Sequence, residues 1–160
     1  PPHGCSIKNL IIGDVCHVIW DLAGASSYRN RWLNKPGYYF CEAEELIFLI
    51  DLQDASYYQH ALTYLQKIVN FIDSKQADGI LTPDFKTYVF LHKGDPNLIN
   101  TKRYKKAQAI LEERISNLKA LLRPEVYCTS ILNYQRNLET GHSNEADSGN
   151  FGHLVGSLLT

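Results

Sequence analysis

The chain lacks methionine, any run of 18 apolar residues and any Cys-x-x-Cys pair. The missing apolar run excludes a membrane-spanning helix. Its four cysteines are scattered, which fits reduced thiols in a cytoplasmic protein better than a disulfide framework. An excess of either charge is lacking too, because 16 Lys and Arg stand against 17 Asp and Glu. We therefore expect a cytoplasmic protein with no transmembrane segment and no nucleic-acid partner.

The sequence opens with Pro-Pro-His-Gly instead of a methionine, so we expect further residues before Pro1. Its 160 residues contain 44% apolar and 11% aromatic side chains. These values are typical of one globular domain with a sizeable core. We accordingly interpret residues 1–160 as a single unit.

Strand-like and helix-like patterns alternate along the chain. Two β-rich runs flank the turn dipeptide Gly13-Asp14, and three later apolar runs each have the length of a strand. Helical periodicity follows two of those runs; Ser56 with Gln59 predicts a capping box before one helix, and Thr101 predicts the N-cap of the other. The expected strands are 5–12, 15–22, 46–50, 88–91 and 126–128. The apolar stripes of the two helices span 58–72 and 104–122, with Gly79 closing the first helix and Pro124 the second, and 133–150 is expected to be a loop or insertion. This order predicts an α/β fold with a doubly wound, mostly parallel sheet and one antiparallel hairpin.

Ligands of such sheets bind beyond the carboxyl ends of the strands, so the residues after each strand are the candidates. Asp21 and Gly24 form an Asp-x-x-Gly after the second run. The carboxylate can hold Mg²⁺ through water, and the glycine lets a backbone N–H approach a phosphate. A plain turn explains the pair equally well.

The tetrapeptide His92-Lys93-Gly94-Asp95 follows the run 88–91. A carboxylate such as that of Asp95 can accept from both the ring N1–H and the exocyclic amino group of guanine, whereas adenine lacks this pair of donors. The alkyl stem of Lys93 can lie on the purine face, and His92 can tie the loop to its neighbours. An ordinary turn closed by Pro96 is the alternative.

A third segment, Thr129-Ser130-Ile131, follows the last short strand. The three segments in this order resemble the Ras superfamily of small GTPases, which have a P-loop NTPase fold. The stretch Trp20 to Gly24 is similar to the Arf branch. The run from Leu46 to Tyr58, the histidine at position 92 and the segment 129–131 are more similar to the Rag branch, which we favour.

The resemblance implies that the chain binds GTP and GDP with Mg²⁺ and works as a molecular switch. Asp21 would lie near Mg²⁺ and Gly24 would sense the γ-phosphate. Residues 1–4 and 23–34 would be the two switch regions. Lys93 and Asp95 would bind the base, and Ser130 would reach guanine O6. The other nucleotide-binding residues would be His92, Thr129 and Ile131.

Protein partners are implied at the switch regions, where aromatic residues gather between Tyr28 and Phe40. Packing of these side chains against the domain itself is the alternative. A related GTPase as heterodimer and a roadblock- or longin-type scaffold are further implied partners, and such partners would recruit the protein to a membrane surface.

The chain departs from the family pattern at three points. No Gly-x-x-x-x-Gly-Lys-[Ser/Thr] occurs in it, so we expect this phosphate loop before Pro1. Pro2 stands where the family has a Mg²⁺-binding threonine, and Ala25 stands where it has the glutamine that orients water, so no catalytic residue is assigned. We expect slow or partner-assisted GTP hydrolysis.

Two other functions fit the same residues. One is a GTPase-like pseudoenzyme that acts as a structural or heterodimer subunit, which the absent phosphate loop, Pro2 and Ala25 favour. The other is an unrelated doubly wound domain, such as a receiver-like module, in which Asp51 at a strand end would be the acidic site. The basic residues 102–106 are expected to be a solvated helix face instead of a phosphate site.

Overall fold

The structure is a computed structural model that describes residues 3–80, 84–118 and 124–130. It divides into two compact units, whose described parts are residues 3–31 in the first and residues 32–80, 84–118 and 124–130 in the second. The predictions for Pro1, Pro2, Ile131, the loop 133–150 and the end of the helix up to Leu122 lie outside the described residues. Within these residues, none of the helices combines the length and apolar character that a bilayer crossing requires.

The first unit contains a β-hairpin with the predicted bounds. β1 (Cys5–Ile12) pairs antiparallel with β2 (Val15–Leu22), and Ile12 lies opposite Val15 across the turn. Gly13 in that turn has φ +60°, a conformation that favours glycine. At the other end of the hairpin the N–H of Ala23 donates to the carbonyl of Gly4 at 2.8 Å, which extends the ladder by one more pair.

The segment 23–34 was expected to be a loop or an irregular helix, and most of it is helical. α1 (Ser26–Asn34) begins just after Ala25, whose carbonyl accepts from the N–H groups of Tyr28 and Arg29. Its residue Trp32 is 1% exposed and packs edge-on against Tyr39, with ring centroids 4.7 Å apart. Two of the five aromatic residues between Tyr28 and Phe40, Trp32 and Phe40, are therefore core residues, whereas Tyr38 is 62% exposed.

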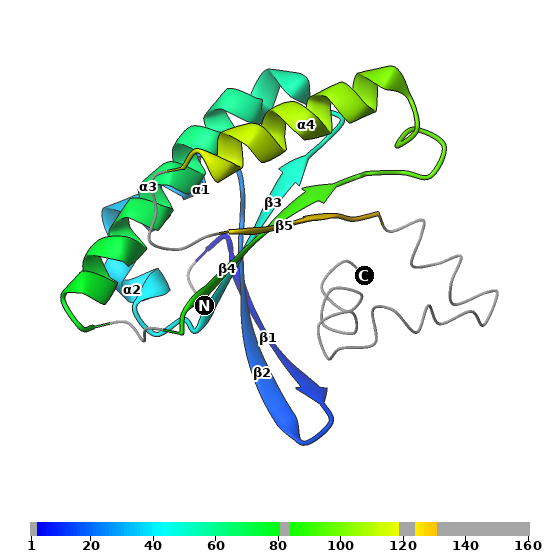
Figure 1. Cartoon of the computed structure of the whole chain (residues 1–160). Coiled ribbons are helices and arrows are strands. Elements are labelled where there is room, and N and C mark those ends of the chain that lie inside the picture. The colour runs from blue at the N-terminus through cyan, green and yellow to red at the C-terminus, as the bar shows by residue number, and fades with distance from the viewer. Residues whose placement is uncertain (1–2, 81–83, 119–123, 131–160) are drawn as a thin grey trace. The chain divides into compact units, whose positions relative to one another are not determined.

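A parallel sheet in the order β3-β4-β5 forms the centre of the second unit (Figure 1). Each strand is separated from the next along the chain by a helix, as the alternation of patterns predicts. The mixed α/β class, the parallel sheet and the antiparallel hairpin are confirmed. The elements are α2 (Pro36–Phe40), β3 (Glu45–Asp51), the 3₁₀ turn η1 (Ala55–Tyr57), α3 (Tyr58–Ala77), β4 (Lys86–His92), α4 (Lys102–Ser116) and β5 (Glu125–Cys128).

The core lies between the sheet and two helices, α3 and α4, that run side by side over one face (Figure 1). Leu65 of α3 and Leu111 of α4 are fully buried there against Val89 and Leu91 of β4. The alternate residues of β4, among them Phe90, are buried as well. Both faces of β4 are thus covered, as expected for the middle strand of a parallel sheet.

The two helix starts differ from each other. Thr101 caps α4 as predicted, because its Oγ1 accepts from the N–H of Tyr104 at 3.4 Å. The capping box predicted at Ser56 and Gln59 is wrong. Ser56 donates to Asp54 Oδ1 at 2.5 Å and Gln59 donates to Thr63. A 3₁₀ turn occupies this position, so the chain enters α3 without a side-chain cap.

Candidate functional site

The carboxyl ends of β3, β4 and β5 meet at one edge of the sheet. The register places Asp51 beside His92 and Leu91 beside Cys128. Three loops therefore begin at the same edge. Backbone hydrogen bonds join them, from Leu52 N–H to the His92 carbonyl at 2.9 Å and from Thr129 N–H to the Leu91 carbonyl at 3.1 Å.

The loop after β4 is held by an unusual backbone at Lys93 and Gly94. Lys93 has φ +62°, the left-handed region that residues with a side chain seldom adopt. Gly94 is buried, and its N–H donates to the carbonyl of Thr129 at 2.9 Å. A Cβ added at Gly94 would overlap the Sγ of Cys128. A larger residue at the third position of the tetrapeptide would therefore require the side chain of Cys128 to move.

Asp95 lies in the middle of the site, and both oxygens of its carboxylate are hydrogen bonded. Ser130 Oγ donates to Oδ1 at 2.6 Å, and Gln53 Nε2 donates to Oδ2 at 3.0 Å. Ser130 is 6% exposed whereas Asp95 is only half-buried. A carboxylate offers about four lone-pair sites, so about two remain for further donors. The carboxylate can thus accept the two N–H groups that guanine presents on one edge.

The ammonium group of Lys93 pairs with Asp51, with Nζ 2.6 Å from Oδ2. This hydrogen bond, followed by the charge of Asp51, raises the pKa of Lys93 above its ordinary value, so the group stays cationic. The side chains are 52% and 36% exposed, and solvent weakens such pairs. The contribution of this pair is therefore mainly to orient the lysine, whose alkyl stem remains available to cover a flat ligand.

Asp51 also organises its own loop, because its Oδ1 accepts from the N–H of Gln53 at 2.8 Å. Its two oxygens thus serve the backbone of one loop and the lysine of the next. In this arrangement the carboxylate has structural partners, in contrast to the free acidic site of a receiver-like module.

His92 links the loops after β4 and β5, as predicted. Its Nδ1 lies 3.1 Å from Thr129 Oγ1. Burial is the main cause that lowers the pKa of His92, and the nearby charge of Lys93 acts in the same direction. The imidazole is accordingly held in its neutral form.

Sequence reasoning missed two side chains of this site, Gln53 and Tyr104. Gln53 Nε2 bonds to Asp95 and lies 3.4 Å from the carbonyl of Lys93, and the hydroxyl of Tyr104 donates to that same carbonyl. Gln53 lies two residues past the end of β3, so the strand-end rule applied to that strand would have found it. Tyr104 belongs to the apolar stripe of α4 and carries no separate signal.

Asp21 and Gly24 belong to the first unit. Asp21 is an exposed residue of β2 opposite Ser6. Gly24 is exposed, and a Cβ built on it would meet no atom within 4 Å. A single exposed carboxylate suits Mg²⁺, which usually takes one or two carboxylates and completes its shell with water and phosphate oxygens. No group of three His, Cys, Asp or Glu residues gathers into a metal site in the described ranges.

Residues 6–136 match the family model described as the Gtr1/RagA G protein conserved region. The match covers most of the chain and includes the hairpin apart from Cys5, the parallel sheet and the residues that follow each of its strands. The Rag-like resemblance is thereby confirmed, and the receiver-like alternative is wrong.

The neutral state of His92 predicts a pH-dependent stability. The unfolded chain takes up a proton near the ordinary pKa of 6.5, whereas the folded chain does so only at lower pH. The unfolded state then binds more protons, so the free energy of unfolding falls as the pH decreases through and below that value. In His92→Asn, the drop in melting temperature between about pH 7.5 and about pH 5.5 should be smaller than in the parent. His60→Asn, on exposed α3 surface, is the control; an unchanged drop in His92→Asn would contradict the inference.

The contact at Gly94 predicts a destabilisation with a specific rescue. Gly94→Ala should lower the free energy of unfolding by about 1–3 kcal/mol, because the new methyl group overlaps Cys128 Sγ. Cys128→Ala removes the sulfur, so the double variant should recover much of the loss in urea titrations. Gly24→Ala, at an open position, is the matched control for stability. Equal losses in Gly94→Ala and in the double variant would show that another contact is responsible.

Proposed function

Since the chain belongs to the Gtr1/RagA family of G proteins, we propose that it is a molecular switch that binds GDP and GTP at the carboxyl edge of its parallel sheet and hydrolyses GTP slowly. The family is one of guanine-nucleotide-binding proteins. The proposal adds the residues that read the base, the switch behaviour and the slow turnover.

The geometry of Asp95 carries the proposal. Its carboxylate is half-buried at the sheet edge and is oriented by Ser130 and Gln53. In the proposed complex it accepts N1–H and the amino group of guanine, while the stem of Lys93 covers one face of the base. Thr129, Ser130 and Ile131 supply the loop that approaches guanine O6, and His92 ties that loop to the tetrapeptide.

The family resemblance implies roles toward Mg²⁺ and the γ-phosphate for two residues, Asp21 and Gly24. We propose that Asp21 holds Mg²⁺ through water and that the backbone of Gly24 senses the γ-phosphate. Bound Mg²⁺ would supply neutralisation of phosphate charge. By the family resemblance, residues 1–4 and 23–34 are the proposed switches; in sequence they directly precede β1 and follow β2. Partners that read the switches, among them a related GTPase as heterodimer, belong to the same proposal.

The base-reading role predicts a change in nucleotide preference. Asp95→Asn replaces one acceptor by an N–H donor, which suits the carbonyl that xanthine has in place of the amino group of guanine. Affinity for GDP should fall about 100-fold and affinity for xanthosine diphosphate should rise, measured by competition on the full-length protein. Asp54→Asn is the matched control, since Asp54 bonds to Ser56 outside the site. A GDP preference unchanged in Asp95→Asn would refute the assignment.

Ala25 favours slow turnover and also a second candidate, the pseudoenzyme subunit. This residue offers a carbonyl to the start of α1 and only a methyl side chain, which cannot orient attacking water. Ala25→Gln should raise the single-turnover rate of GTP hydrolysis by about 10-fold or more. Ser26→Gln, with the same side chain one position later, is the control.

The two candidates differ in their bound nucleotide. Stoichiometric GDP or GTP released from denatured full-length protein supports the switch. Absence of guanine nucleotide, together with no turnover in either glutamine variant, supports the pseudoenzyme.

A further inference from the structure

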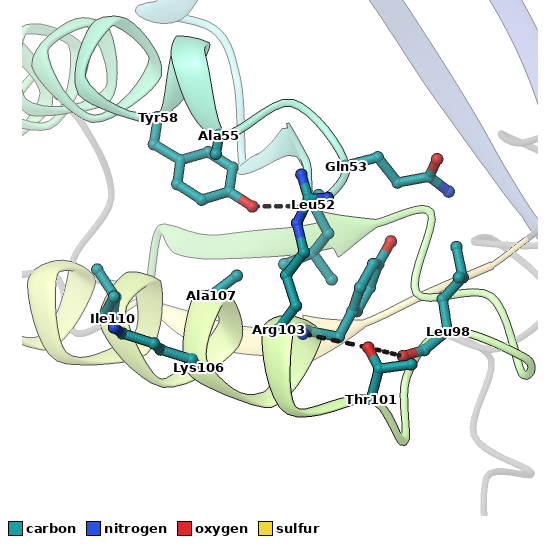
Figure 2. Close-up of a pocket in the computed structure, with 11 residues that line it drawn as sticks. Leu52, Gln53, Ala55, Tyr58, Leu98, Thr101, Arg103, Lys106, Ala107 and Ile110 are labelled. Carbon is teal, nitrogen blue, oxygen red and sulfur yellow. Dashed lines mark hydrogen bonds between the residues drawn. The ribbon is translucent and has the colours of Figure 1, made fainter.

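A groove of about 560 Å³ lies between the segment after β3 and helix α4 (Figure 2). Its apolar lining consists mainly of Leu52, Ala55, Leu98, Ala107 and Ile110. Ile110 is 40% exposed, although it is a large apolar residue on a helix whose inner face is already packed. The groove lies wholly within the second unit and is separate from the carboxylate of Asp95.

The same groove has a basic side. Arg103 and Lys106 line it from α4, and both are exposed. In Figure 2 the side chain of Arg103 extends from α4 across the opening toward Leu52 and Tyr58. A cation above an apolar floor is suited to a ligand that carries both a carboxylate and apolar side chains.

The charges around the groove are unbalanced. Four of the first five residues of α4 are Lys102, Arg103, Lys105 and Lys106, and its first turn has no acidic residue. The ion pairs among the described residues are Lys75–Asp78 and Lys93–Asp51, so none of these four cations takes part in one there. Like charges three or four residues apart destabilise a helix. The cluster is therefore not explained by helix stability, and an acidic partner would offset the repulsion.

From this complementarity we propose that the groove binds an acidic, amphipathic peptide segment of a partner protein. Its apolar side chains occupy the floor, and its carboxylates pair with Arg103 and Lys106. The concave shape favours a peptide over a flat anionic membrane, because a bilayer surface cannot enter the groove and contact its floor.

Two lining residues connect the groove to the loop after β4. Gln53 lines the groove and donates to Asp95 Oδ2, and Tyr104 lines it and donates to the carbonyl of Lys93. A peptide that displaces either side chain would alter the hydrogen bonds of the loop. Binding at the groove should therefore change the rate of nucleotide release, a consequence that rests on the proposed function.

The test uses the full-length protein and a fluorescent helical 14-residue peptide, designed with Leu on one face and Glu on the other. A peptide with Lys in place of each Glu is the probe control. In anisotropy titrations the acidic peptide should bind saturably and the basic peptide should not. Arg103→Glu/Lys106→Glu should weaken binding about 10-fold or more, whereas Lys102→Glu/Lys105→Glu should weaken it by about 3-fold or less, because these two lysines do not line the groove.

Equal losses in the two double variants would overturn the proposal, because bulk charge alone would then explain binding. Absence of saturable binding, or binding only to vesicles of phosphatidylserine, would overturn it as well. Release of fluorescent GDP with and without peptide is measured separately. An unchanged rate of GDP release would overturn the connection to the loop and leave the docking site supported. Failure to bind GDP at all would count against the proposed function, whereas the peptide titration would still test whether the groove binds the acidic peptide.

Discussion

The contact between Gly94 and the end of β5 is the constraint on which the base-reading loop depends. The N–H of Gly94 donates to the carbonyl of Thr129 at 2.9 Å, and the missing side chain at residue 94 leaves room for the sulfur of Cys128. The close approach brings Ser130 within 2.6 Å of Asp95. The left-handed backbone of Lys93 is held in turn by the Tyr104 hydroxyl on its carbonyl. The orientation of the Asp95 carboxylate thus depends on the packing of the loop after β4 against the loop after β5.

The parallel register of the strands brings these groups together independently of side-chain contacts. In a parallel sheet every strand ends at the same edge, so the loops after β3, β4 and β5 are neighbours whatever their sequence. Asp51 and Gln53 then make the loop after β3 part of the site through Lys93 and Asp95. The tetrapeptide alone does not define the site; two residues from the preceding strand end complete it.

Helix α4 serves two surfaces. Its inner stripe, with Leu111 and Ile115 fully buried, packs against the sheet. Its first turns carry cations toward the solvent and, at Arg103 and Lys106, toward the groove. Tyr104 lies between these surfaces and reaches the loop of Lys93. A helix that is both a structural support and the wall of a groove can transmit a change at one surface to the other.

The sequence alone determined the five strands, the two long helices and their order. Period-two and helical patterns are local, so the hairpin 5–12 and 15–22, the parallel strands and the cap at Thr101 were predicted near their observed bounds. The residue types at one strand end were sufficient to name Lys93 and Asp95 as candidates, whereas Ser130 was added by the family resemblance. Only the tertiary structure decided their partners. Asp95 lies 42 residues from Gln53 and 35 from Ser130 in sequence, and such pairs depend on sheet register and loop packing, which no local pattern encodes. The same holds for Ser56, where a 3₁₀ turn stands before α3 in place of the capping box that the local sequence predicts. It also holds for Trp32, whose burial depends on neighbours that a sequence pattern does not specify.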